Sequence, residues 1–268
     1  IDGEIDGWFT DDTPARFRAY GWHVIESVDG HDGEAVAKAI AEAEKNLSAP
    51  TLICCKTKIG FGSPNKSGKA SSHGSPLGAE EIQLTRAALD WHSDPFEIPS
   101  DIKQGWDCTE KGANLENTWQ QVFAEYAQTF PELAAEFERR MAGNLPENWA
   151  DSMDTLQAEI ASNGASKASR QASADVIAAM AQVLPELLGG SADLSGSNNT
   201  NWPEMKVVKP GDTEGNYIHY GVREFGMTAI ANGLALHGGL VPYTGTFLIF
   251  MEYARNAVRM SALMGIQN

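Results

Sequence analysis

A strand–helix–strand pattern constrains the fold of this chain more than any other feature. In residues 22–64, apolar residues cluster at 24–28, recur at helical spacing over 36–47, and then form a continuous run at 51–55. Asp32 stands where a helix N-cap is expected. An unbroken apolar strand suits a parallel sheet that is covered on both faces. The pattern therefore predicts a βαβ unit.

A second alternating pattern begins near residue 169, after a stretch that is mostly helical from 79 to 162. Its expected elements, in chain order, are a helix at 170–183, a strand at 187–191, the polar loop SADLSGSNNTNW, a helix at 223–236, a strand at 240–244 and a helix at 247–264. The chain is thus predicted to be of the α/β class, with two parallel-sheet domains joined by a helical linker. The predicted boundaries are 1–130, 131–165 and 166–268.

Composition and charge exclude several classes of protein. The chain has 268 residues, 42% of them hydrophobic and 21% charged, which is typical of a soluble globular protein large enough to be an enzyme. The net charge of −16 disfavours nucleic acid and anionic lipid as partners. No apolar run reaches the length of a membrane span, so a cytoplasmic location is the simplest interpretation. Three cysteines form no disulfide framework or metal motif.

Two short motifs carry little functional information. DGHDG at 29–33 lacks the oxygen ligands that an EF-hand needs at its third and fifth positions, so a turn followed by a helix cap is the favoured interpretation. GFGSP at 60–64 follows a strand but has neither the spacing nor the ending of a nucleotide-binding loop. By itself it is a weak indication of phosphate binding.

Three polar residues are candidates for binding or catalysis. His73 lies in a long polar loop, and loops of that length in compact domains are commonly functional or mobile. Arg170 stands at a predicted helix start, where a bound anion or simple surface exposure would each explain a cation. Ser197 follows a predicted parallel strand, at the end where α/β sheets bind ligands, although a turn residue is also expected there.

Glu224 is a carboxylate in an apolar stretch, between Val222 and Phe225 and ahead of a helix of small residues. A buried carboxylate must be ion-paired, hydrogen-bonded or protonated. The adjacent Arg223 is a poor partner, because neighbouring helical residues point about 100° apart. Glu224 therefore needs a partner from elsewhere.

Aromatic residues recur at every third position after GLVPYTGT, at Phe247, Phe250 and Tyr253. A stripe of this kind on a helix more often marks the core than a binding platform. Periodicity alone does not distinguish the two.

Several longer motifs, read together, resemble the transketolase family of thiamine-diphosphate enzymes in its bacterial or plant form. They are CCKTKIGFGSPNKSG with SSHGSPLG, GGSADLSGSNNT, GNYIHYGVREFGM and LHGGLVPYTGTFLIFMEYARNAVRM. The resemblance runs in order from the first residue to the last. It implies the end of a diphosphate-binding domain followed by the start of a pyrimidine-binding domain. The chain is expected to be the central part of a longer enzyme, with the metal-binding GDG…N motif upstream of Ile1.

The resemblance also implies an activity. Transketolases transfer a two-carbon ketol unit from a ketose phosphate such as xylulose 5-phosphate to an aldose phosphate such as ribose 5-phosphate or erythrose 4-phosphate. The reaction proceeds through an ylid and an enamine of thiamine diphosphate, which is bound with Mg²⁺ or Ca²⁺, and serves the pentose phosphate pathway or the Calvin cycle. The implied assembly is a homodimer with active sites between subunits.

Two alternatives remain beside this interpretation. One is ketol transfer of the dihydroxyacetone synthase kind, which uses formaldehyde as acceptor. The other is a non-catalytic fragment or pseudoenzyme. Deoxyxylulose-phosphate synthase is disfavoured, because GNYIHYGVREFGM has the transketolase form.

The motifs assign roles to the residues that surround the cofactor. Glu224 matches the family's catalytic glutamate, which hydrogen-bonds the N1′ nitrogen of the aminopyrimidine. The aromatic pocket that receives the pyrimidine ring is matched by Phe247, Phe250 and Tyr253, with Phe250 stacking on the ring. Asp193 lies where the family approaches the thiazolium.

Three further residues match the substrate site of the family. His73 corresponds to the loop histidine that contacts the cofactor's diphosphate and the donor sugar, where it assists proton transfer. Arg170 and Ser197 match residues that bind the phosphate of the sugar.

Overall fold

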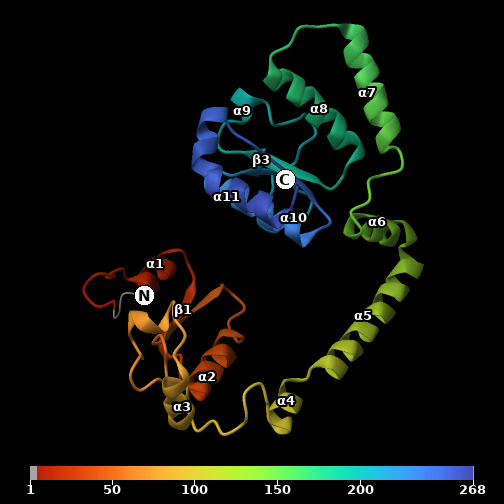
Figure 1. Cartoon of the computed structure of the whole chain (residues 1–268). Helices are drawn as coiled ribbons and strands as arrows, with labels where there is room; N and C mark the ends of the chain where they lie inside the picture. Colours follow the sequence, from red (N-terminus) through yellow and green to blue (C-terminus); the bar gives the residue numbers. More distant parts are fainter. Residues whose placement is uncertain (1–4, 268) are drawn as a thin grey trace. The chain divides into compact units, whose positions relative to one another are not determined.

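The computed structural model (Figure 1) describes residues 5–267 and divides the chain into two compact units. The units are Ile1–Asp107 and Cys108–Asn268. Each unit has its own parallel sheet with helices packed against it, so the predicted α/β class is confirmed.

The first unit contains the predicted βαβ unit. Strands β1 (His23–Asp29) and β2 (Thr51–Lys56) pair in parallel, and α2 (Gly33–Ala43) connects them. Asp32 caps α2 as predicted, because its Oδ1 accepts hydrogen bonds from the backbone N–H groups of Glu34 at 2.9 Å and Ala35 at 3.3 Å.

The helix α2 ends earlier than its apolar periodicity predicts. The pattern extends to Leu47, but the helix stops at Ala43 and the Leu47 side chain is 93% exposed. Asn46 accounts for the end, because its Oδ1 accepts hydrogen bonds from the backbone N–H of Ser48 at 3.1 Å and from the Ser48 hydroxyl at 2.9 Å. This local turn competes with helix continuation.

The rest of the first unit is short helices and one long loop. The helices are α1 (Thr13–Ala19), α3 (Ala79–Ala88), α4 (Ser100–Trp106) and the 3₁₀ turn η1 (Ala70–Ser72). Residues 57–78 contain only η1, and α3 begins at Ala79, within the segment 60–81 that is predicted as a loop.

The second unit is built on a three-stranded parallel sheet in the order β4-β3-β5. Its main elements are α8 (Ser169–Val183), β3 (Leu187–Ser191), β4 (Tyr217–His219), α10 (Glu224–His237), β5 (Val241–Gly245) and α11 (Met251–Met264). In Figure 1, α8 lies on one side of β3, and α10 with α11 on the other. The strand β4 was not predicted, because three residues are too few for a recognisable period. The chain runs from the central strand β3 to one edge and then crosses to the other.

Two adjacent glycines allow the central strand to pack closely. A Cβ at Gly189 would lie 2.1 Å from the ring of Tyr243, and one at Gly190 would lie 1.9 Å from the carbonyl oxygen of Ile218. Both approaches are far below van der Waals contact, so only glycine fits at these positions. The GG of the sequence is therefore required by the sheet.

Helices fill the rest of the second unit. They are α5 (Thr109–Thr129), α6 (Pro131–Met141), α7 (Trp149–Asn163), the short α9 (Ser195–Asn198) and the 3₁₀ turn η2 (Leu248–Phe250). The turn α9 lies in the segment predicted as a loop. The segment predicted as one helix from 247 to 264 is divided, because η2 precedes α11.

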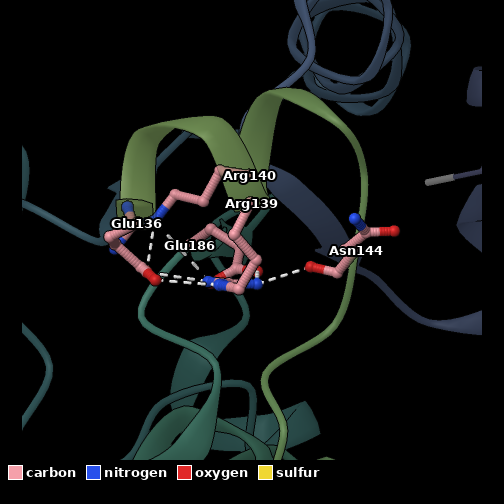
Figure 2. Close-up of polar contacts among 5 residues, drawn as sticks. All are labelled: Glu136, Arg139, Arg140, Asn144 and Glu186. Carbon is pink, nitrogen blue, oxygen red and sulfur yellow. Dashed lines mark hydrogen bonds and ion pairs between the residues drawn. The ribbon is translucent and has the colours of Figure 1, made fainter. Parts of the chain in front are cut away.

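A network of charged side chains anchors α6 to the amino end of β3 (Figure 2). Arg139 donates to both Glu186 oxygens, at 2.8 and 2.9 Å, and to both Glu136 oxygens, at 2.8 and 2.7 Å. Arg140 adds a bond to Glu136 at 2.7 Å. The Glu186 side chain is only 5% exposed, so its charge depends on this arginine.

The same hydrogen bonds, above all the one from Arg139, hold the pKa of Glu136 at about 2 instead of its ordinary 4.5. A carboxylate with a lowered pKa in the folded state stabilises the protein at pH values above its ordinary pKa. This contribution is fully present above pH 4.5 and is lost as the pH falls towards 2.

Arg139→Met should lower the free energy of unfolding by about 3 kcal/mol, because it leaves the buried Glu186 charge without its bidentate partner. Urea unfolding measures this loss. Arg255→Met is the matched control, since Arg255 makes an exposed i,i+3 pair with Glu252 at 3.8 Å. That variant should change stability by less than about 0.5 kcal/mol. Equal losses in the two variants would show that the network does not anchor α6.

Candidate functional site

The order of the strands brings three chain segments to one edge of the second unit's sheet. The carboxyl ends of β3, β4 and β5 meet there, at the point where the strand order reverses. Open α/β sheets bind ligands in the crevice at such a point. A cavity of about 550 Å³ opens at this edge, lined by Ala192, Asp193, Leu194, Val222, Glu224, Phe250 and Tyr253. Four of the predicted site residues are among them.

Glu224 is buried at this edge, with 8% of its surface exposed. It is the first residue of α10, where the positive end of the helix dipole favours a carboxylate. The adjacent Arg223 turns away, because its Nη1 donates to the carbonyl oxygen of Tyr220 at 2.9 Å. Within residues 5–267, no hydrogen bond or ion pair reaches the Glu224 carboxylate. The carboxylate is thus placed to meet a partner in the cavity.

The predicted surroundings of Glu224 need one correction. Val222 and Phe225 were expected to exclude solvent from it, but these side chains are 74% and 52% exposed. Val222 lines the mouth of the cavity and does not cover it.

The three predicted aromatic residues form a continuous stack. The ring of Phe250 lies 6.0 Å from that of Phe247, at an interplanar angle of 25°, and 6.3 Å from that of Tyr253, at 29°. Tyr253 is 67% exposed and Phe247 is 38% exposed. The alternative interpretation of this stripe as core is therefore wrong: the stack faces the cavity and its surroundings.

The segment after β3 has an unusual backbone conformation. Asp193 has a φ of +61°, in the left-handed region that non-glycine residues rarely adopt. The buried Ser191 holds the turn, because its hydroxyl accepts a hydrogen bond from the backbone N–H of Leu194 at 3.1 Å. Such conformations are common at ligand sites.

Two tyrosines from the flanking strands support the same segment. The Tyr217 hydroxyl lies 2.5 Å from the Ser195 hydroxyl and 2.8 Å from that of Thr200. The Tyr243 hydroxyl donates to the carbonyl oxygen of Thr200 at 2.5 Å. Burial raises the pKa of Tyr243 and keeps it a donor. These supports are not predictable from the sequence, because tyrosine is a common residue in any β-strand.

The floor of the cavity is apolar. Ala192 packs in a buried cluster with Ile218, Tyr220 and Met227. Burial raises the pKa of Tyr220 to about 12, so its hydroxyl stays protonated. The cavity thus combines one buried carboxylate, exposed aromatic rings and an apolar floor.

A second cavity of about 850 Å³ lies between the start of α8, the turn α9 and the end of β5. Arg170, Ser197 and Phe247 line it, so the structure brings these three predicted residues together. Thr246 also lines it, and its buried Oγ1 has no hydrogen-bond partner within the described part of the chain. This cavity offers a cation and several hydroxyl groups to a polar ligand.

His73 lies in the first unit. It is exposed and directly follows η1. The glycines of GFGSP shape this loop: Gly60 has a φ of +65°, and a Cβ there would lie 2.9 Å from Ser72. The motif therefore has a packing role beside His73.

Residues 5–267 contain neither a cluster of metal ligands nor a membrane-spanning helix. No group of three or more His, Cys, Asp or Glu residues there could hold a metal ion. No helix in the same range is long and apolar enough to cross a membrane.

The comparison with protein families covers nearly the whole chain. The family model described as "Transketolase, thiamine diphosphate binding domain" matches residues 1–146, and "Transketolase, pyrimidine binding domain" matches residues 165–268. The chain belongs to the transketolase family. The predicted resemblance is confirmed, and the two parallel sheets belong to these two thiamine-diphosphate-binding domains.

Transketolases of known sequence and structure agree with this membership. Transketolase 1 of Vibrio cholerae is 57% identical over all 268 residues, and transketolase 2 of Escherichia coli is 57% identical over 264 residues. The chain spans about 40% of the length of these relatives. The transketolase of Pichia stipitis in complex with sedoheptulose 7-phosphate matches 97% of this chain with a TM-score of 0.85 and 38% identity; the match covers 39% of that chain. For the transketolase of Leishmania mexicana the TM-score is 0.84 at 34% identity, over 97% of this chain and 38% of that one.

Proposed function

We propose that this protein is a transketolase that transfers a two-carbon ketol unit from a ketose phosphate to an aldose phosphate. The observation that carries the proposal is the buried Glu224, which has no partner in the described chain and lies beside the Phe250 stack. Related transketolases have been solved with sedoheptulose 7-phosphate and with fructose 6-phosphate. Sugar phosphates are thus the proposed substrates.

The cavity fits thiamine diphosphate, the proposed cofactor. An aminopyrimidine is a flat ring with polar nitrogens at its edge, and the cavity presents flat rings, an apolar floor and the carboxylates of Asp193 and Glu224. Phe250 and Tyr253 would hold the ring face, with Phe247 completing the stack. When bound, the cofactor supplies the carbanion chemistry that breaks and forms the carbon–carbon bonds.

Glu224 is proposed to share a proton with the ring nitrogen of the bound pyrimidine. Its side chain is 8% exposed and lines the cavity, and it stands at the first position of α10. Asp193 is proposed to approach the cofactor from the strained turn after β3.

The second cavity is proposed to bind the phosphorylated sugar. Arg170 provides a fork of donors suited to phosphate, and Ser197 provides a hydroxyl. His73 is proposed to contact the cofactor's diphosphate and the donor sugar and to assist proton transfer there.

Further proposals follow from family membership. They are a homodimer with active sites between subunits, a cytoplasmic location, and Mg²⁺ or Ca²⁺ bound with the cofactor. In residues 5–267, no group of three or more His, Cys, Asp or Glu residues could hold that ion. The proposed domain boundaries remain 1–130, 131–165 and 166–268.

The proposed activity is tested with the full-length protein, thiamine diphosphate, Mg²⁺, xylulose 5-phosphate and ribose 5-phosphate. Formation of sedoheptulose 7-phosphate is the expected result. A second reaction replaces ribose 5-phosphate with formaldehyde. Turnover with formaldehyde alone would identify dihydroxyacetone synthase chemistry, and no turnover with either acceptor would refute ketol transfer.

Glu224→Gln should slow the exchange of the C2 proton of bound thiamine diphosphate by at least about 10²-fold, because the amide cannot exchange a proton with the ring nitrogen. Deuterium exchange followed by NMR measures this rate. Glu252→Gln, an exposed change on α11, is the control and should leave the exchange rate unchanged. An unaltered rate in Glu224→Gln would remove the glutamate from its proposed role.

Arg170→Ala should raise the KM for xylulose 5-phosphate about tenfold or more, because a charge-assisted hydrogen bond is lost. The KM for unphosphorylated xylulose should stay the same. Arg170→Lys keeps the charge without the fork and should give an intermediate value. Similar losses on both sugars would argue against a phosphate contact.

A further inference from the structure

A third buried glutamate lies in the first unit, at the beginning of the stretch that the sequence predicts to be mostly helical. Glu81 of α3 is 7% exposed, and its carboxylate accepts three hydrogen bonds from the 57–78 loop. The Ser63 hydroxyl donates to Oε1, the Asn65 backbone N–H donates to Oε1 at 2.9 Å, and the Asn65 side-chain amide donates to Oε2 at 2.9 Å. One carboxylate thus fixes residues 63–65, the part of the loop that precedes His73.

Further hydrogen bonds connect residues 63–66 to residues 76–77, the part of the loop that follows His73. The Ser63 hydroxyl also accepts from the backbone N–H of Lys66 at 3.1 Å. The Lys66 ammonium then donates to the carbonyl oxygens of Leu77 at 2.8 Å and Pro76 at 3.4 Å. These two segments lie on either side of His73 in the chain. Glu81 and Lys66 together therefore hold both ends of the segment that contains His73.

The loop between these two segments is also folded on itself. The backbone N–H of Gly68 donates to the Ile59 carbonyl at 2.8 Å, and the Ser72 hydroxyl donates to the Lys69 carbonyl at 2.8 Å. The backbone N–H of His73 donates to the Ala70 carbonyl at 3.0 Å. The backbone position of His73 therefore depends on a loop that Glu81 fixes from outside.

The charge state of Glu81 matches this role. Hydrogen bonds from Ser63 and then Asn65 lower its pKa to about 2, so it remains ionised and acceptor-only over the whole working range of an enzyme. A glutamine at the same place would lose the charge and replace one acceptor oxygen with an NH₂ donor, so it could not accept all three hydrogen bonds in this arrangement.

We propose that Glu81 is a positioning residue for ketol transfer. It acts through His73 by fixing the 57–78 loop. The inference rests on the proposed function for the role of His73. The contacts of Glu81 do not depend on it.

Hydrogen–deuterium exchange tests the structural half of the proposal in the intact protein. Glu81→Gln should accelerate amide exchange in peptides that cover residues 59–77, because the acceptor of the Asn65 N–H is weakened. Glu80→Gln is the matched control: it removes the same charge one position earlier in the first turn of α3, at an exposed residue. Equal exchange in the two variants would overturn the proposal.

Steady-state kinetics test the functional half. Glu81→Gln should lower kcat/KM for xylulose 5-phosphate about tenfold or more, because a small displacement of a substrate-contacting group is costly. In a His73→Ala background the same change should have almost no further effect. Losses that simply add in the double variant would show that Glu81 does not act through His73 and would overturn the proposal.

A milder variant covers the case in which Glu81→Gln does not fold. Asn65→Ala removes one donor from an exposed residue and should give a smaller effect in the same direction in both measurements. No effect in either would contradict the proposal. If wild-type protein forms no sedoheptulose 7-phosphate while loop exchange still depends on Glu81, the failure belongs to the proposed function and not to the contacts.

Discussion

The close packing of β3 between β4 and β5 is the constraint on which the candidate site depends. With no side chains at Gly189 and Gly190, the Tyr243 ring and the Ile218 carbonyl lie directly against the central strand. The three strands are parallel, so their carboxyl ends meet at one edge. The turn with Asp193, the start of α10 with Glu224 and the aromatic stack are the continuations of these strands. A side chain in the middle of β3 would separate the elements that the cavity needs together.

Three buried glutamates differ in their partners, and the difference distinguishes carboxylates that stabilise the fold from one that is placed to bind a ligand. Glu186 has a bidentate arginine, and Glu81 accepts three hydrogen bonds. Both are satisfied within the chain, as buried charges in a stable fold must be. Glu224 is buried to a similar degree, but no partner within residues 5–267 satisfies its carboxylate. Folding alone does not account for a carboxylate in that condition, whereas a ligand with a donor at its edge does.

The sequence predicted local features well and distant contacts poorly. The βαβ unit, the Asp32 cap and the poor match of Arg223 to Glu224 follow from spacing and short-range geometry, and the structure agrees with them. The strand β4 is too short to show a period, and the end of α2 was set by a side-chain turn at Asn46 that competes with the apolar pattern.

The role of Glu81 and the Arg139–Glu186 pair could not be predicted from the sequence for another reason. The donors to Glu81 lie 16 to 18 residues away, and Arg139 and Glu186 are 47 residues apart. Such pairs depend on how distant elements pack against each other, which local patterns do not encode.

The identity of the cofactor follows from the family resemblance alone, since physical reasoning about Glu224 requires a partner without identifying it. The aromatic stripe shows the same limit and its physical reason: Phe250 lines the cavity of Glu224, while Phe247, stacked on it at 6.0 Å, lines the cavity of Arg170. A stripe that joins two binding cavities has the same spacing as one that packs in a core, and only the surface on either side of it tells them apart.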